Sequence, residues 1–424
     1  MTETRPYQGP HPSVYLLLFL PFGITSGYAT VTLSYMLSKG GASVAAVAGV
    51  VGMSLLPNTW KVLWAPLVDT TLSSKAWYLI SVGLSAAAFA GCAFLPYTVA
   101  MVPVFGALMF VMGAVSTLLA MSIERLMAFD TPDDQKGRAG GWSQAGNMGG
   151  SGLGGGAGLW LAQHSSLPWL PAAVLGLACM LSAIGLIWLK EPARDRSLHY
   201  LTVIKDSAKD VWSLVKTRIG LLAALLLVLP LGTGAATNLW GAIAKDWGAG
   251  ADEVALVGGL LAGLISIPGA IAGGYICDRI DRKLGYALFG LATAAVAVAM
   301  AFGPRTPMGF MVGASLFNLA LGFVYGGYAA MTLEAIGKGA AATKYNLLAS
   351  LANVPLLVMT LADGWAQTKW GSGGMLIFEA AIGVAAAVFF LAVIRFTRGL
   401  TWGAVFGRLR PAALAEGDEH DLQP

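Results

Sequence analysis

Twelve apolar runs, each long enough to cross a lipid bilayer as a helix, decide what this chain can fold into. A helix needs about 20 apolar residues to cross the hydrocarbon core. Charged residues make up only 11% of the chain, too few to cover the surface of a soluble protein of 424 residues. The sequence therefore predicts an all-α membrane protein. The twelve transmembrane helices are expected near residues 13–38, 41–67, 76–96, 99–123, 139–163, 168–189, 219–244, 252–276, 284–303, 308–332, 342–366 and 373–396.

The basic residues predict how these helices are oriented. Of the 26 Lys and Arg residues, 21 lie in the two tails, in the connections that follow even-numbered runs, or (Lys344 and Arg395) at the run ends next to them. Only four lie in the other connections (Lys39, Lys245, Arg305 and Lys369), and Lys61 lies within a run. Since basic residues are retained on the cytoplasmic side, this bias predicts that both termini are cytoplasmic, in a multi-pass protein of the cell inner membrane.

The longest connection divides the chain into two halves. It carries seven basic residues and repeats apolar residues at three- or four-residue steps, as expected for an amphipathic helix on the inner membrane face. Two six-helix bundles joined in this way are typical of secondary transporters. The predicted domains are an N-terminal bundle (1–189), a linker (190–218), a C-terminal bundle (219–396) and a cytoplasmic tail (397–424).

A charged loop motif occurs at equivalent places in the two halves. After run 8 the chain contains Asp278, Arg279, Arg282 and Lys283, and after run 2 it contains Asp69. One acid and several cations at a helix end can clamp neighbouring helices through their charges and the helix dipole. The alternative is an ordinary basic cluster of a cytoplasmic loop. Both interpretations of these five residues, gating and an ordinary basic cluster, fit the sequence pattern.

This repeated loop resembles the signature of the major facilitator superfamily, which implies that the loops latch the cytoplasmic side of an alternating-access transporter. Two longer stretches, 56–69 with its Lys61 and Leu63-Trp64-Ala65-Pro66-Leu67, and 342–351, resemble the group of the AmpG muropeptide permease and the acetyl-CoA transporter. Siderophore permeases are similar to that group, so its motifs do not fix the cargo. The acidic pattern that the group carries late in span 4 is absent here, which leaves Glu379, Asp363 and Glu124 as the proton-coupling candidates, with interfacial or paired acids as the alternative.

Polar side chains recur on single faces of several predicted helices, at equivalent places in the two halves. They predict a water-lined cavity for an organic solute; the alternative is hydrogen bonding between packed helices. Lys61 is either a contact for an anionic group, part of the inner gate, or a side chain that reaches the headgroups. The predicted substrate-binding residues are Tyr28, Thr32, Tyr35, Lys61, Gln144, Asn147, Thr237, Trp240, Tyr325, Asn346, Ser350 and Asn353.

Ten of the nineteen residues from Gly140 to Gly158 are glycine. No Gly-Lys-Ser/Thr sequence follows, so this is not a phosphate-binding loop. We expect this run to bring its helix into close contact with a neighbouring helix.

The expected function is import of a polar or amphiphilic organic solute, muropeptide-like or siderophore-like, by alternating access and with protons. The alternatives are export of a metabolite or drug, and a membrane sensor that does not transport. We expect no enzyme activity, no metal and no cofactor, because the runs lack a visible catalytic or metal-ligating cluster. The expected partners are a small-molecule substrate, the proton gradient and the lipid bilayer, without nucleic acid, for a monomer.

Overall fold

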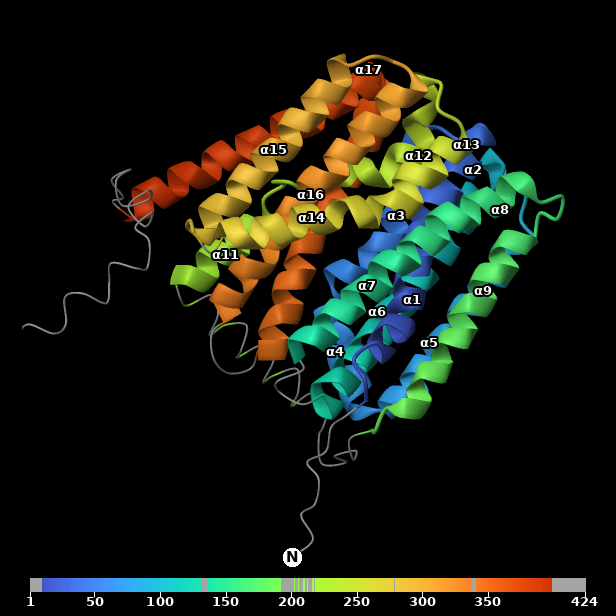
Figure 1. Ribbon diagram of the computed structural model, residues 1–424, viewed down its shortest axis with the longest axis horizontal. Coiled ribbons are helices and arrows are strands. Elements are labelled where there is room, and N and C mark those ends of the chain that lie inside the picture. Colours follow the sequence, from blue (N-terminus) through green and yellow to red (C-terminus); the bar gives the residue numbers. More distant parts are fainter. Residues whose placement is uncertain are drawn as a thin grey trace, which may run out of the picture.

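The computed structural model describes residues 10–131, 136–191, 218–277, 279–336 and 341–398, and single positions of the linker. In these residues the regular structure is all helical, without strands, and the longer helices lie side by side (Figure 1). Eight of the described helices are long and apolar enough to cross a membrane. The predicted fold class is confirmed. We call the side at which Val14 and Asp130 lie the terminal side, and the side at which Lys39 and His164 lie the distal side.

The first half contains spans 1 to 6. Short π- or 3₁₀-helical segments interrupt several of them. The elements are α1 (Val14–Gly27), η1 (Tyr28–Leu33) and α2 (Ser34–Lys39) in span 1; α3 (Val44–Thr59) and α4 (Lys61–Thr70) in span 2; α5 (Ser74–Ala93) in span 3; η2 (Val99–Met101) and α6 (Val102–Asp130) in span 4; α7 (Lys136–Gly152), η4 (Leu153–Ala157) and α8 (Gly158–His164) in span 5; α9 (Leu170–Ser182) and η5 (Ala183–Trp188) in span 6.

The second half contains spans 7 to 12. Spans 11 and 12 form one element that turns back at Gly371, whose φ of 68° favours glycine. The elements are α11 (Arg218–Val228), η6 (Ala235–Leu239), α12 (Trp240–Ile243) and η7 (Ala244–Trp247) in span 7; α13 (Ala251–Val254), η8 (Ala255–Leu260) and α14 (Leu261–Cys277) in span 8; α15 (Arg282–Phe302) in span 9; α16 (Pro307–Ile336) in span 10; α17 (Ala341–Arg398) in spans 11 and 12.

Helix packing is repeated between the halves. Span 2 packs on span 4 (α3 on α6), and span 8 packs on span 10 (α14 on α16). Span 1 packs on span 5, and span 7 contacts α17 through both α11 and η6. The same neighbours in both halves are what a duplicated six-helix unit produces.

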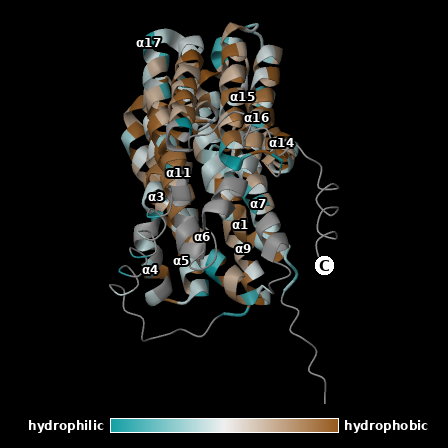
Figure 2. Cartoon of the chain, turned by 90° about the vertical axis from the view of Figure 1, so that its left-hand side faces the viewer, coloured by the Kyte–Doolittle hydropathy of each residue, from teal (hydrophilic) through white to brown (hydrophobic). Residues whose placement is uncertain are grey.

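The outer surface of the molecule is apolar. Leu79, Ile187, Leu264 and Val388 come from four different spans and are between 54% and 76% exposed. Figure 2 shows apolar residues along the length of the helices. Because the helices satisfy their own backbone hydrogen bonds, such a surface is stable in lipid.

The glycine-rich span 5 lies directly against span 1, which confirms the predicted close contact with a neighbouring helix. A methyl group on Gly146, Gly150 or Gly154 would overlap the backbone of Leu16, Leu20 or Ile24. These three glycines recur at every fourth position and therefore share one face of α7 and η4. Small residues let two backbones approach closely where lipid provides no hydrophobic force between helices.

Tyr78 joins three spans of the first half and provides a test of this packing. Its buried hydroxyl donates to the Leu18 carbonyl at 3.0 Å and lies 2.8 Å from the Ser182 hydroxyl. We expect Tyr78→Phe to lower the free energy of unfolding by about 1 kcal/mol, because two buried polar groups lose a partner. Thermal unfolding in detergent measures this. Tyr275→Phe is the control, because Tyr275 is 64% exposed, and an equal loss in both variants would contradict the assignment.

Candidate functional site

The two halves meet most closely in the distal half of the molecule. A methyl group on Gly259 of span 8 would overlap the backbone of Gly156 in span 5. A Cβ on Gly241 of span 7 would lie 2.9 Å from the Tyr35 nitrogen of span 1. Ala48 of span 2 lies against Gly364 of span 11 in the same way. These close contacts, each made by a glycine of the second half, close the distal side.

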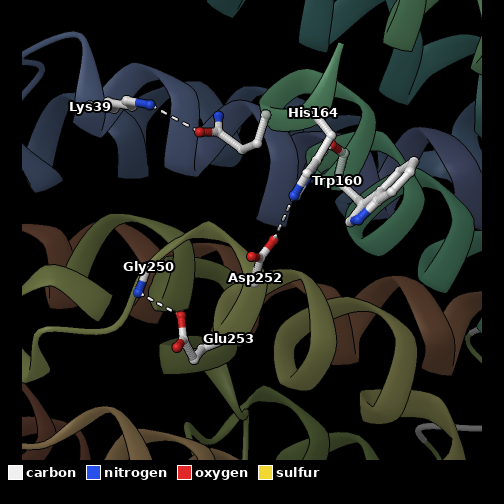
Figure 3. A network of polar contacts seen from close by, with 7 residues as sticks. Lys39, Trp160, His164, Gly250, Asp252 and Glu253 are labelled. Carbon is white, nitrogen blue, oxygen red and sulfur yellow. Dashed lines mark hydrogen bonds and ion pairs between the residues drawn. The ribbon is translucent and has the colours of Figure 1, made fainter.

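Polar side chains cover this closure at its distal end (Figure 3). His164 Nε2, at the end of α8, lies 3.9 Å from an oxygen of Asp252 in α13, so that this ion pair connects the two halves. Both side chains are well exposed, at 45% and 69%. The Trp160 ring stacks on the His164 imidazole, with 4.8 Å between the ring centroids. Exposed pairs of this kind contribute little to stability, so the closure depends on the glycine contacts below it.

Span 2 is kinked at Trp60, which separates α3 from α4. Trp60 has φ −122° and ψ 12°, and Pro57 lies one turn earlier, where its ring removes a backbone hydrogen bond. The kink makes Lys61 the first residue of α4, and its side chain is half-buried. Next to it the Trp60 ring meets Trp64 and Phe110 edge to face, at 6.4 and 6.5 Å. The structure therefore places one cation and an aromatic cluster in the same segment of span 2.

Span 5 carries two of the predicted polar side chains. Gln144 is exposed and Asn147 is half-buried, although both lie well inside α7. An amide group at this depth needs water or a polar partner.

The predicted residues of span 1 lie mainly inside the first half. Tyr28 is fully buried, stacks edge to face on Phe89 at 5.1 Å, and its hydroxyl lies 3.4 Å from that of Tyr97. Thr32 donates to the carbonyl of Gly154 at 2.8 Å. These are the interhelical contacts that the sequence analysis gave as the alternative to a cavity. Tyr35, which is half-buried, lies at the distal contact with span 7.

Of the predicted substrate-binding residues in spans 7 and 10, two take part in contacts within the second half and one is exposed. Thr237 donates to the Gly234 carbonyl at 2.7 Å. Trp240 is buried, with its ring edge to face on Phe310 and Phe317 at 6.1 and 5.4 Å. Tyr325 in α16 is half exposed.

The structure describes two of the three predicted substrate-binding side chains of span 11. The Asn346 side chain lies outside the described part. Ser350 is buried, and its hydroxyl has no partner among the described residues. Asn353 is half-buried and donates to the Ala349 carbonyl at 2.7 Å.

The gating residues are described only in part. Asp278 and the Asp69 side chain lie outside the described residues, so the predicted acid–base latch is not seen. Arg279 is exposed and Arg282 is half-buried. The Lys283 side chain is fully buried in the first turn of α15, a helix that Asp281 caps by accepting hydrogen bonds from the Lys283 and Leu284 amides.

Two of the three predicted acids are buried together in the second half. Asp363 is 0% exposed and Glu379 is 8% exposed, and they interact electrostatically. Glu124 is half-buried and lies within α6, because this helix continues to Asp130, seven residues beyond the predicted end. A pair of acids at membrane depth is expensive and is typical of ion-coupling sites.

The sequence analysis treats span 7 as one continuous helix, but the structure breaks it. The helix α11 ends at Val228, and regular structure resumes only at Ala235. Gly232 and Gly234 in the break have φ of 63° and 66°. The signal was present as Pro230 followed by these two glycines, which a hydropathy average does not detect.

Comparison with known proteins gives one family and one fold. Residues 13–356 match the Major Facilitator Superfamily. A crystal structure of a D-xylose-proton symporter superposes with a TM-score of 0.69 at 16% identity, covering 92% of this chain and 99% of that chain. The nucleoside transporter NupG superposes with 0.68 at 13% identity, covering 90% and 98%. The xylose transporter XylE from E. coli, in a partially occluded inward open conformation, superposes with 0.68 at 13% identity, covering 90% and 97%.

Proposed function

Because this chain belongs to the Major Facilitator Superfamily, we propose that it imports a polar or amphiphilic organic solute by alternating access. The observation that carries the proposal is the distal closure, in which glycines of span 5 and span 8 lie backbone against backbone. We expect the two halves to separate at these glycine contacts while each bundle stays folded. The structure then represents the state that is closed on the distal side.

We assign the terminal side to the cytoplasm of a cell inner membrane. The bias of basic residues supports this orientation, because the terminal side carries the basic tails, linker and loops. The state closed on the distal side is then inward-facing, and the exposed Gln144 lies on the route to the cytoplasm.

We propose that the cargo contacts Lys61, the neighbouring aromatic cluster, Gln144 and Asn147. The combination of one cation, three aromatic rings and neutral amides suits an anionic solute with a sugar-like or aromatic part, such as a muropeptide or a siderophore. The resemblance of span 2 to the AmpG group supports the same class. The solved transporters of similar fold are named for xylose and nucleosides, which are also polar organic solutes.

We propose protons as the driving ion. The buried acids Asp363 and Glu379 provide groups that can bind a proton within the second half. The named proton symporter of similar fold supports this choice.

The function is tested by a thermal-shift screen of the purified protein against cell-wall fragments, siderophores and nucleotide thioesters, followed by uptake in proteoliposomes. We expect one class to raise the melting temperature and to accumulate only when the outside is more acidic. Proton-driven transport of the solute in the outward direction would favour the alternative that the protein is an exporter. Binding without flux in either direction would favour a sensor.

Lys61→Ala tests the binding residue that the sequence pattern marks most clearly. We expect KM for uptake to rise about tenfold or more, because a charged hydrogen bond of about 1.5–3 kcal/mol is lost. Lys61→Arg should keep most of the affinity, and Lys369→Ala, an exposed distal cation, should change nothing. Unchanged uptake by Lys61→Ala, at the same folded yield, would remove Lys61 from the site.

A further inference from the structure

The break in span 7 lies beside a buried carboxylate of span 12. Between α11 and η6 the backbone passes through Pro230, which has no N–H group, and two left-handed glycines. Glu379 reaches this break: its Oε2 and Oε1 accept hydrogen bonds from the Ala236 amide at 3.3 and 3.4 Å, and Oε1 also accepts one from the Thr233 hydroxyl at 3.5 Å. The carboxylate therefore holds the start of the distal part of span 7.

A cavity large enough for about one water molecule lies next to the Glu379 carboxyl. Thr233 lines it from span 7, Thr293 and Ala297 line it from α15, and Phe317 lines it from α16. Among the described residues that line this cavity, Glu379 is the only ionisable one. A single water at a buried carboxyl provides a route for a proton but little room for a larger ligand.

The other ionisable groups around Glu379 are few. Asp363 of span 11 is fully buried, and neither of its oxygens has a hydrogen-bond partner among the described residues. On α15, the Tyr286 hydroxyl donates to the Leu231 carbonyl at 3.4 Å, on the other side of the break. At the distal end of the same span-7 segment, Asp246 accepts a hydrogen bond from the Ser372 hydroxyl.

The segment that Glu379 holds also makes the distal contact with span 1. Ala242 of α12 accepts a hydrogen bond from the Ser38 hydroxyl at 3.1 Å, and the neighbouring Gly241 lies against the Tyr35 backbone. This segment therefore contacts Glu379 at one end and forms part of the distal closure at the other.

We propose that Glu379 is a proton-binding site that controls the distal contact between spans 1 and 7. The charged carboxylate is a stronger acceptor for the Ala236 amide than the protonated form, so it holds span 7 in the closed position. Protonation weakens these bonds and releases the segment, which opens the distal side. This inference rests on the proposed transport function, for which it names the coupling group and the element it moves.

A proton fits this site better than a metal cation. Both Glu379 oxygens already face an N–H group, and a metal ion would have to displace that donor to bind them. Hard cations such as Ca²⁺ and Mg²⁺ also take six or more oxygen ligands, which one water-sized cavity does not provide.

The test measures the distal distance directly and needs no substrate. Ser166 and Lys369 are exposed and lie in distal connections of opposite halves, and the three native cysteines are buried, so Ser166→Cys/Lys369→Cys accepts two spin labels. In lipid nanodiscs we expect the ratio of distal-open to distal-closed protein to rise about tenfold or more as the pH is lowered. In Glu379→Gln this pH response should fall to less than about twofold.

His164 provides the decisive control, because it is the histidine of the distal network and lies 3.9 Å from Asp252 of the other half (Figure 3). We expect His164→Gln to keep the pH response. A response that is lost in His164→Gln and kept in Glu379→Gln would overturn the proposal. So would a response in wild type that follows the NaCl concentration at constant pH.

A second measurement on wild type covers the case in which Glu379→Gln does not fold. Hydrogen exchange of a peptide spanning the break should accelerate about tenfold on acidification after correction for intrinsic exchange, whereas a peptide from span 5 should not. Equal changes in both peptides would overturn the proposal. Neither experiment contains cargo. A negative result would therefore contradict the proton site without contradicting transport, and a failed uptake assay would contradict transport without contradicting the proton site.

Discussion

Gly259→Ala will hold the two halves apart on the distal side and leave both bundles folded. The added methyl group would overlap the backbone of Gly156, which belongs to the other half, and meets nothing closer in its own half. Overpacking of this kind costs about 1–3 kcal/mol, and this cost is paid only in the closed state. We therefore expect the distal-closed population to fall about tenfold or more relative to the open one.

Gly258→Ala is the matched control, because it changes the adjacent residue of the same π-helical segment. A Cβ on Gly258 would lie 3.8 and 3.9 Å from the nearest methyl groups of Val31 and Val254, which is ordinary contact. Spin-label distances between positions 166 and 369 report the populations. Equal distance distributions in the two variants would show that the Gly156–Gly259 approach does not limit closure.

Gly154→Ala will destabilise the first half itself. The new methyl group would overlap the backbone of Ile24, and both residues belong to the same bundle, so that no conformational change of the transporter relieves the overlap. We expect a loss of about 2–3 kcal/mol or failure to fold, measured as melting temperature and yield of monodisperse protein.

The control for Gly154→Ala is Gly149→Ala, which lies five residues earlier in the same span. A Cβ on Gly149 meets nothing within 4 Å, and alanine is a better helix former than glycine by about 1 kcal/mol, so Gly149→Ala should be neutral or stabilising. Equal destabilisation by both variants would mean that helix flexibility, and not the contact with span 1, explains the glycine run.

Hydropathy and helix length predicted the framework well, because lipid allows few alternatives to a bundle of helices. Span 5, expected at 139–163, runs from Lys136 to His164. The predicted end of span 4 at residue 123 is seven residues too early, because Glu124 and Arg125 are charged residues of the kind that hydropathy assigns to a loop, whereas α6 continues to Asp130. Arg125 remains in the helix and donates to the Val68 carbonyl of span 2 at 3.1 Å.

The candidate site could be predicted only in part, because helical spacing identifies a polar face but not its neighbour. Thr32 and Asn147 follow the same pattern in the sequence, yet Thr32 bonds to span 5 within its own half. The sequence marks Glu379 as a proton-coupling candidate, but the spacing of residues does not predict its contact with span 7. Its contact with Ala236 joins residues 143 positions apart and depends on a break that hydropathy averages conceal.

Distances measured on both sides of the same molecule test alternating access most directly. Leu72 and Tyr275 are exposed near the terminal ends of opposite halves and provide a terminal pair to compare with the distal pair at positions 166 and 369. In nanodiscs across a range of pH, we expect the terminal distance to shorten whenever the distal distance lengthens. A single distal-closed distribution under every condition, with a terminal distance that never changes, would contradict transport by rocking of the two halves.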